Sequence, residues 1–494
     1  MTPRHNLPLL PLLLMMLMVF VSVLATAAES APQSIGDQPL LFVDLAIVAK
    51  STGVSLKLHP PRKTGERLLT AEHPWESATL NWFTVLRDGE RFRMWYECYD
   101  VDGWPTTDDT SFCYAESQDG IHWTKPELGL HNYKGSSANN ILFRQVGEGK
   151  HRSRVHGHGL FIDPTAPPDS RYKCVSQGMF QGIGDRPYYI AGMTSPDGLR
   201  WTRQATPICP VFADSQYSAF WDESLKQYVL YGRVGGRGRA IGRSTSARFD
   251  TFPPLKLVFE NSDDNPPRSD WYNPACSQYP GQKSLYVMLP SQFRHQPDTL
   301  DIHLAVSRDG VKWTSPDRST PFIPLGRPED FDGGSLYAAN GIVEVGDELW
   351  FYFSGAKLKH EETTIEKLAK PENRRVFSRA VAKKDRLVSL HTDESSGEKP
   401  GTVETIPILF EGNQLHINAA TRAGGVVRVA LLDEQGKVIP GRGLDDCIPF
   451  EGDQVSHRVA WKTGFDVADW ASKPVSLRLE LVNADVYSVR FQKP

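Results

Sequence analysis

The chain has 494 residues and a formal net charge of −4, and its 55 basic and 59 acidic side chains form no long block of either sign. Nucleic acid is therefore not an expected partner, because neutralising phosphates requires clustered Lys and Arg. The length exceeds that of one ordinary domain, so one large and one small domain are expected. Aromatic residues make up 10% of the chain, together with 40 Gly and 36 Pro. Many turns and many aromatic strands favour an all-β fold.

The N-terminus has the pattern of an export signal. An apolar run from Leu7 to Leu24 follows a charged start, and Ala25-Thr26-Ala27 supplies small residues for cleavage. The run is almost long enough to be a membrane anchor, but Pro8 and Pro11 interrupt it early. We therefore expect residues 1–27 to be a signal peptide, the mature protein to be secreted or periplasmic, and no membrane association to remain after cleavage.

A short phrase, Ser-x-Asp-Gly-x-x-Trp, begins at Ser117, Ser195 and Ser307 and each time follows a strand-like run. Asp-Gly is a strong turn signal, because Gly accepts a positive φ and Asp caps its own turn. The Trp three residues beyond the Gly can then fold back as an apolar anchor. A strand-turn unit repeated at unequal intervals is typical of a β-propeller, in which each blade is one four-stranded sheet.

The strand-like runs group into five candidate blades, and residues 28–391 are predicted to form a five-bladed β-propeller. One charged insertion in the fifth blade, His360 to Lys370, is expected to form a short helix on the surface. The candidate blades cover residues 75–123, 154–201, 214–259, 270–313 and 332–390.

The residue composition and the hydrophobic pattern of the chain change after Leu390. Residues 392–402 are polar and contain Gly, which suits a linker. Alternating apolar and polar runs then continue over residues 403–494, and their combined length is common for a β-sandwich. The predicted fold is therefore all-β, a five-bladed β-propeller followed by a C-terminal β-sandwich.

Six cysteines are too few for a disulfide-built scaffold of this length. Their even number in an exported chain permits disulfides. Cys98 and Cys113 lie on successive strand-like runs and are the candidate pair.

The three phrases and Ile162-Asp163-Pro164, near the end of a second-blade strand, resemble the five-bladed propeller glycosidases. That superfamily includes arabinanases, levansucrases and invertases, in glycoside hydrolase families 32 and 43. The resemblance implies a secreted glycosidase that hydrolyses plant or algal poly- or oligosaccharides through acids of the first three blades. At those acids this sequence departs from the superfamily, because it has no Asn-Asp-Pro opening, no Arg-Asp-Pro and no blade-three Glu-Cys.

Other phrases resemble secreted planctomycete proteins that are similar to the family 32 N-terminal domain. They are Leu41-Phe42-Val43-Asp44, Pro74-Trp75-Glu76, Phe220-Trp221-Asp222-Glu223 and Asp446-Cys447-Ile448-Pro449.

The innermost strand of each propeller blade lines the central channel, so acids that enter those strands should converge at one mouth. Four blades have an acid shortly before the first strand, and we predict these as the catalytic residues: Glu76, Asp214, Asp270 and Asp332. Glycoside hydrolysis needs two carboxyl groups, one protonated and one ionised. Each acid has a structural alternative, because an Asp or Glu before a strand often caps a turn.

Substrate-binding residues are predicted from the same strand entries. His156 and His158, two apart on one strand, should point the same way, while aromatic residues suit sugar stacking and Arg233 suits an acidic or sulfated sugar. Tyr96 and Glu97 are expected in blade packing. The predicted binding residues are Trp75, Asn81, His156, His158, Asp163, Tyr217, Arg233, Tyr272 and Asn273.

No metal site and no cofactor are predicted, because the histidine pair lacks a clear third ligand. The channel acids would nevertheless suit Ca²⁺, which prefers oxygen ligands. Two functions follow from the sequence: a glycoside hydrolase that acts through channel-lining carboxylates, and a non-catalytic carbohydrate-binding propeller that has lost the superfamily acids. The oligomeric state is left open.

Overall fold

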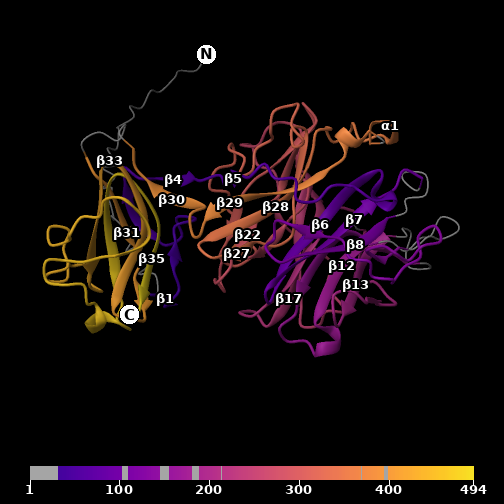
Figure 1. Ribbon diagram of the computed structural model, residues 1–494. Coiled ribbons are helices and arrows are strands. Elements are labelled where there is room, and N and C mark those ends of the chain that lie inside the picture. The colour runs from indigo at the N-terminus through magenta and orange to yellow at the C-terminus, as the bar shows by residue number, and fades with distance from the viewer. Residues whose placement is uncertain are drawn as a thin grey trace, which may run out of the picture.

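The computed structural model describes residues 32–102, 110–144, 155–180, 188–212, 214–368, 370–393 and 399–493. The predicted signal peptide lies outside these residues. The described chain forms two bodies of β-structure that lie side by side (Figure 1). Its one α-helix is α1 (Ile365–Leu368), so the fold is nearly all-β, as predicted. No helix of the described residues combines the length and apolar character needed to cross a membrane.

The first three sheets of the larger body are antiparallel and match the first three predicted blades. The first contains β6 (Thr79–Asp88), β7 (Arg91–Tyr99), β8 (Ser111–Ser117), β9 (Trp123–Thr124) and β10 (Ile141–Phe143). The second contains β11 (His156–Ile162), β12 (Tyr172–Met179), β13 (Tyr188–Ser195), β14 (Thr202–Arg203) and β15 (Cys209–Phe212). The third contains β16 (Ser218–Asp222), β17 (Gln227–Gly236), β18 (Gly238–Ser246) and β19 (Lys256–Phe259).

The rest of the larger body does not divide into two separate four-stranded sheets. A three-stranded sheet contains β21 (Cys276–Gln278), β22 (Tyr286–Met288) and β25 (Ala305–Ser307). An eight-stranded sheet contains β5 (Arg62–Lys63), β20 (Ser269–Trp271), β23 (Ser291–Arg294), β24 (Thr299–Ile302), β26 (Ser335–Ala338), β27 (Val343–Val345), β28 (Glu348–Ala356) and β29 (Val376–Lys383). A single residue pair, Leu300 with Ser335, joins the strands of the fourth and fifth predicted blades. The number of five blades therefore stays a prediction.

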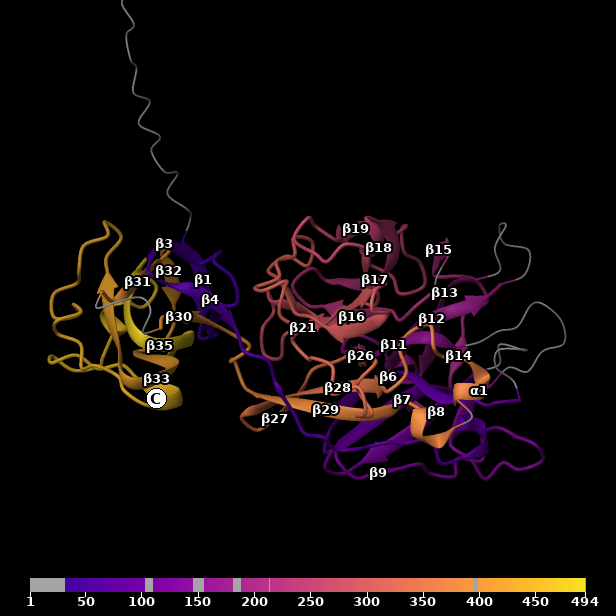
Figure 2. The same cartoon turned by 90° about the horizontal axis from the view of Figure 1, so that it is seen from above.

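Strand β5 closes the ring of sheets. It precedes the first sheet in the chain, yet Arg62 and Lys63 pair with Val381 and Ala380 on β29, the last strand of the larger body. Seen from above, the sheets surround a common centre near β6, β11, β16 and β26 (Figure 2). The sheets therefore have a propeller arrangement, in which an N-terminal strand covers the edge of the last sheet.

The three Asp-Gly phrases fold as predicted. In the first, the Asp119 carboxylate accepts the backbone N–H groups of Ile121 and His122 at 2.8 Å each. Trp123 folds back, and its indole N–H donates to the Gly120 carbonyl oxygen at 3.1 Å. The same bonds recur in the copies that begin at Ser195 and Ser307. The Asp side chains of the phrase are therefore structural.

Each phrase also joins its sheet to a neighbouring one. An aromatic side chain from the neighbouring sheet donates to the phrase Gly carbonyl: Trp95 to Gly198 at 2.7 Å, Tyr231 to Gly310 at 2.7 Å and Tyr352 to Gly120 at 3.0 Å. A Cβ atom on any of these glycines would lie within 2.7–2.8 Å of that aromatic side chain. Glycine is thus required both for its positive φ and for this close contact. The Tyr352 bond links β28 to the first sheet and so helps to close the ring.

The smaller body combines both ends of the chain. From the N-terminal side it contains β1 (Gln33–Gly36), β2 (Leu40–Leu41), β3 (Val48–Thr52) and β4 (Ser55–Leu58). From the C-terminal side it contains β30 (Val388–His391), β31 (Gly401–Thr405), β32 (Ile408–Phe410), β33 (Gln414–Leu432), β34 (Asp453–Arg458) and β35 (Ser476–Gln492). Short 3-10 turns also occur at Pro74–Glu76, Pro168–Ser170, Pro371–Asn373 and Ala468–Trp470.

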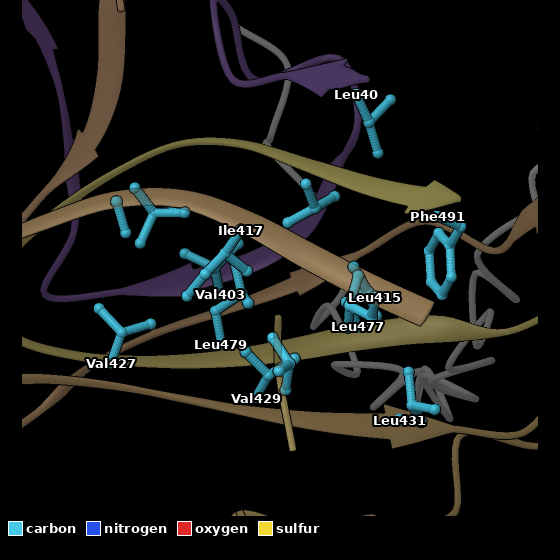
Figure 3. Close-up of a cluster of buried hydrophobic side chains, with 14 of the residues drawn as sticks. Leu40, Val403, Leu415, Ile417, Val427, Val429, Leu431, Leu477, Leu479 and Phe491 are labelled. Carbon is cyan, nitrogen blue, oxygen red and sulfur yellow. The ribbon is translucent and has the colours of Figure 1, made fainter. Parts of the chain in front are cut away.

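This arrangement differs from the predicted domain limits. Residues 33–58 were expected in the propeller, but β2 pairs with β35, β3 with β31, and β4 with β30. Residues 392–402 connect β30 to β31 within one sheet, so they do not link the two bodies. The physical reason is apolar burial. Leu40 joins the side chains of β31, β33 and β35 in one cluster (Figure 3), and Phe42 beside it is fully buried. The predicted sandwich topology stays a prediction.

Polar contacts and apolar packing connect the two bodies. Arg308 of the larger body pairs with Asp44 at 3.0 Å, and Arg386, just before β30, donates to Asn418 at 2.7 Å. Leu41, Val43 and Leu58 pack in the same core as residues of the propeller sheets. The two bodies therefore share a continuous interface.

All six cysteines are buried, free thiols. Cys98 on β7 and Cys113 on β8 are neighbours, with their sulfur atoms 3.6 Å apart. The structure thus brings the predicted pair together as two thiols.

Candidate functional site

A pocket of about 220 Å³ lies where the inner strands of the sheets meet. Asn81 on β6, His156 on β11 and Tyr337 on β26 line it, together with Asp214 before β16 and Tyr272 after β20. Asn81, His156, Asp214 and Tyr272 are among the residues predicted from the strand entries, whereas Tyr337 was not predicted.

The acidic side of the pocket is built around His156. The Nδ1 atom of its ring lies 2.8 Å from Oε1 of Glu97, a fully buried carboxylate on β7. The Glu97 carboxylate also accepts from the Tyr99 hydroxyl at 2.9 Å and from the Asn81 amide at 3.2 Å. The Nε2 atom of His156 lies 3.7 Å from Oδ1 of Asp214. One imidazole therefore lies between two carboxylates.

Asp214 is the more accessible of the two carboxylates, with 44% of its side chain exposed. The nearby His156 ring holds the pKa of Asp214 well below its usual range, and the positive charge of Arg233, at 2.9 Å, acts in the same direction against burial. Asp214 is therefore ionised at neutral pH. Arg233, predicted to bind an acidic sugar, is occupied by this pairing.

Aromatic side chains form the opposite wall. Trp82 packs edge-on against Tyr337, with ring centroids 4.6 Å apart, and Tyr272 lies 5.6 Å from Tyr337 and 6.3 Å from Trp82. Such faces offer apolar area beside hydroxyl groups, which suits a sugar ring.

The charged insertion completes the wall. His360, Thr363 and Leu368 line the pocket, and His360 Nε2 lies 3.1 Å from the Tyr272 hydroxyl. The insertion contains the predicted short helix, α1, and its Glu361, Thr364, Glu366 and Lys370 are exposed, as expected for a surface segment. Its side chains close the pocket because they pack against the aromatic cluster.

Glu76 does not reach the pocket, and the structure favours its capping alternative. Its fully buried carboxylate accepts backbone N–H groups of Glu72 and His73 at 2.8 and 3.2 Å. The Tyr96 hydroxyl and the Lys125 ammonium complete its shell at 2.6 and 2.8 Å.

The other two predicted catalytic acids lie elsewhere. Asp270 accepts from the Arg239 backbone and guanidinium at 2.9 and 2.7 Å and contacts His295 at 3.0 Å. It borders a second, more open hollow of about 590 Å³. Asp332 pairs with Lys63 of the closing strand at 2.8 Å. Asp214 is thus the one predicted acid that faces the pocket.

The two histidines of β11 do not point the same way. A register shift lies between His156 and Gly159, and Gly157 takes a positive φ of 62°. This bulge turns His156 toward the pocket while His158 is fully buried, with Nε2 3.0 Å from the Trp95 carbonyl oxygen. Burial lowers the pKa of His158 to about 4.

Four other predicted binding residues are buried in packing positions. The Trp75 indole donates to Asn140 at 3.0 Å, and Asp163 accepts from the Tyr228 hydroxyl at 2.6 Å within a turn. Tyr217 and Asn273 are also buried and do not line the pocket.

Several pocket residues were missed by the sequence analysis. Tyr99 lines the pocket and shares a strand face with Glu97 by period-two alternation, so this face could have been considered. Glu97 was assigned to blade packing and is fully buried, but its carboxylate also contacts the pocket residue His156. Tyr337 and Arg375 carried no sequence signal, because their place in the pocket depends on a sheet that closes late in the chain. Among the residues that the structure describes, no group of three His, Cys, Asp or Glu could hold a metal ion.

The fold and pocket together define a β-propeller with a central site that is aromatic on one side and acidic on the other. No family model matches the sequence, and no curated protein matches it. Solved structures that are similar to this chain carry the names of carbohydrate-active proteins.

One is a glycosyl hydrolase from Bacteroides ovatus, 14% identical, with a TM-score of 0.43 over 71% of this chain and 94% of that one. The β-1,2-mannobiose phosphorylase from Listeria innocua is 12% identical, with a TM-score of 0.47 over 67% and 98%. An N-acetylgalactosamine deacetylase from F. plautii is 16% identical, with a TM-score of 0.42 over 68% and 97%. These likenesses assign no reaction to this chain, and the function proposed below depends on the pocket.

Proposed function

We propose that this protein is a secreted glycoside hydrolase with a five-bladed propeller and a C-terminal sandwich, acting on plant or algal poly- or oligosaccharides. One observation carries the proposal: the ionised Asp214 opens into an aromatic pocket at the centre of the ring, with His156 between it and Glu97. The pocket, at about 220 Å³, is smaller than the roughly 300–1,000 Å³ of sites for drug-sized ligands. It is suited to one sugar residue at the end of a chain.

The arrangement provides two groups for proton transfer. Glu97 lies 2.8 Å from Nδ1 of His156 and fixes the orientation of the ring. His156 would donate a proton to the leaving glycosidic oxygen as the bond to the anomeric carbon breaks. Asp214 would accept a proton from the water that attacks this carbon.

Substrate binding must first separate these two groups. The 3.7 Å between His156 and Asp214 is shorter than the roughly 5 Å that even the closest catalytic carboxyl pairs keep. Because Asp214 is partly exposed, its side chain has room to turn away from the ring.

The second candidate is a carbohydrate-binding propeller without catalysis. It is favoured by the complete burial of Glu97 and by the pairing of Asp214 with Arg233. Such a protein needs only the aromatic wall and hydrogen-bonding groups.

Hydrolysis of a panel of plant and algal glycans by the purified mature protein separates the two. We expect Asp214→Asn and His156→Gln to lower sugar release by about 10²–10⁴-fold, as loss of the general base or the general acid does. Glu223→Gln, an exposed acid outside the pocket, is the matched control. Binding without release from any glycan would select the second candidate. N-terminal sequencing of the exported protein tests the predicted cleavage after residue 27.

A further inference from the structure

Arg375 lines the pocket and, among the described residues, has no acidic partner. The residue is only 6% exposed, and its guanidinium donates to the Ser335 hydroxyl at 3.0 Å and approaches the Ser335 carbonyl oxygen at 3.5 Å. It also lies 4.6 Å from the ring centroid of Tyr337. In the described part of the chain, no carboxylate forms an ion pair with it.

A buried cation without a counter-charge is costly, and proteins normally pair such groups. Burial lowers the pKa of Arg375, and the groups that oppose this effect are the nearby tyrosines. Two other arginines with buried side chains have acidic partners, Arg144 with Asp100 at 2.8 Å and Arg379 with Glu66 at 2.7 Å. Arg442 is also buried and donates to two backbone carbonyl oxygens and a hydroxyl, but unlike Arg375 it does not line the pocket. The place of Arg375 in the pocket wall therefore points to a ligand that supplies the missing negative charge.

The surroundings of Arg375 agree with an anionic ligand. The buried Nδ1 atom of His360 has no hydrogen-bond partner, so the pocket wall contains an unsatisfied polar group in addition to the unpaired charge of Arg375. The guanidinium of Arg239 lies 5.2 Å from the ring centroid of Tyr272 in the same wall. Arg239 is paired with Asp270 and does not line the pocket, so Arg375 is the cation of the lining that has no carboxylate partner among the described residues.

We propose that the pocket selects an acidic sugar, a hexuronic acid residue whose carboxylate binds Arg375 while its ring lies on the aromatic wall. The inference rests on the proposed function of the same pocket and names its substrate class. A carboxylate fits because it matches the planar guanidinium fork with two oxygens. A charge fixed at one end of the sugar would also orient its anomeric carbon toward Asp214.

Calorimetric titration of the purified full-length protein with sodium D-glucuronate and D-galacturonate tests the proposal. D-Glucose, D-galactose, a glucose sulfate and the methyl ester of glucuronic acid are titrated in parallel at constant ionic strength. We expect a uronate to bind at least about tenfold more tightly than its neutral parent sugar and its methyl ester. The ester comparison uses the unmodified protein, so it remains decisive even where a variant fails to fold.

Variants then assign the interaction to Arg375. Arg375→Gln should reduce uronate affinity at least about tenfold, Arg375→Lys should restore part of it, and the exposed Arg248→Gln should leave it unchanged. Equal affinity for uronate and ester, tighter binding of the sulfate, or no uronate binding would overturn the proposal. Asp214→Asn should keep uronate binding, so loss of hydrolysis with binding retained concerns the proposed catalysis alone.

Discussion

Replacing Phe42 by Ala tests whether the N-terminal strands belong to the smaller body. Phe42 is fully buried in the core formed with β31, β33 and β35, and its N–H donates to the Tyr487 carbonyl oxygen at 2.9 Å. Removing a buried phenyl group costs about 3–5 kcal/mol. Because domains are typically stable by only about 5–15 kcal/mol, the smaller body should lose a large part of its stability.

Hydrogen–deuterium exchange measured by mass spectrometry locates the effect. We expect peptides from β33 and β35 to exchange faster in Phe42→Ala, together with an earlier unfolding step in denaturant. Peptides from β12 and β17, in the propeller, should be much less affected, because their cores do not contain Phe42.

The matched control is Leu45→Ala, at a position 52% exposed in the same segment. A surface substitution of this kind changes stability by no more than about 0.5 kcal/mol. Unchanged exchange in β33 and β35, or an equal effect of the two substitutions, would refute the pairing of both chain ends in one body.

Three further predictions concern the buried polar groups. Glu76→Gln should lower the melting temperature, because Lys125 loses its buried counter-charge at a cost of about 3 kcal/mol. Sugar binding at the pocket should persist in this variant. A loss of sugar binding without a lower melting temperature would contradict this expectation. His158 stays neutral when folded, with a pKa of about 4, so the unfolded chain binds a proton first as the pH falls. Its contribution to the free energy of unfolding, on the order of 3 kcal/mol, is therefore complete above about pH 6.5 and is lost as the pH falls toward 4. Denaturant titrations should show that the free energy of unfolding depends less steeply on pH in His158→Gln than in the unmodified protein. All six thiols are buried, and burial raises the pKa of Cys209 to about 11. A thiol reagent should therefore label none of the cysteines until the protein unfolds. Rapid labelling of the folded protein would contradict this prediction.

Local sequence signals determined the strands and turns of this protein. The Ser-x-Asp-Gly-x-x-Trp phrases specify their own turn, because every bond that defines it joins residues within seven positions of one another. Apolar alternation likewise predicted the first three sheets and the all-β class. The same local reasoning placed Asp214 at a strand entry that faces the centre, and the structure agrees.

Tertiary structure alone decided how distant segments combine. Leu40 and Phe42 read as part of the propeller, but their apolar faces are buried against β33 and β35, more than 370 positions later in the chain. The pocket likewise takes its groups from separate segments between Thr79 and Arg375. The Gly157 bulge turns His156 toward the pocket and His158 away from it. A carboxylate before a strand can cap a turn, as Glu76 does, or face a channel, as Asp214 does. Sequence spacing is the same in both cases, and only the packing of non-local neighbours chooses between them.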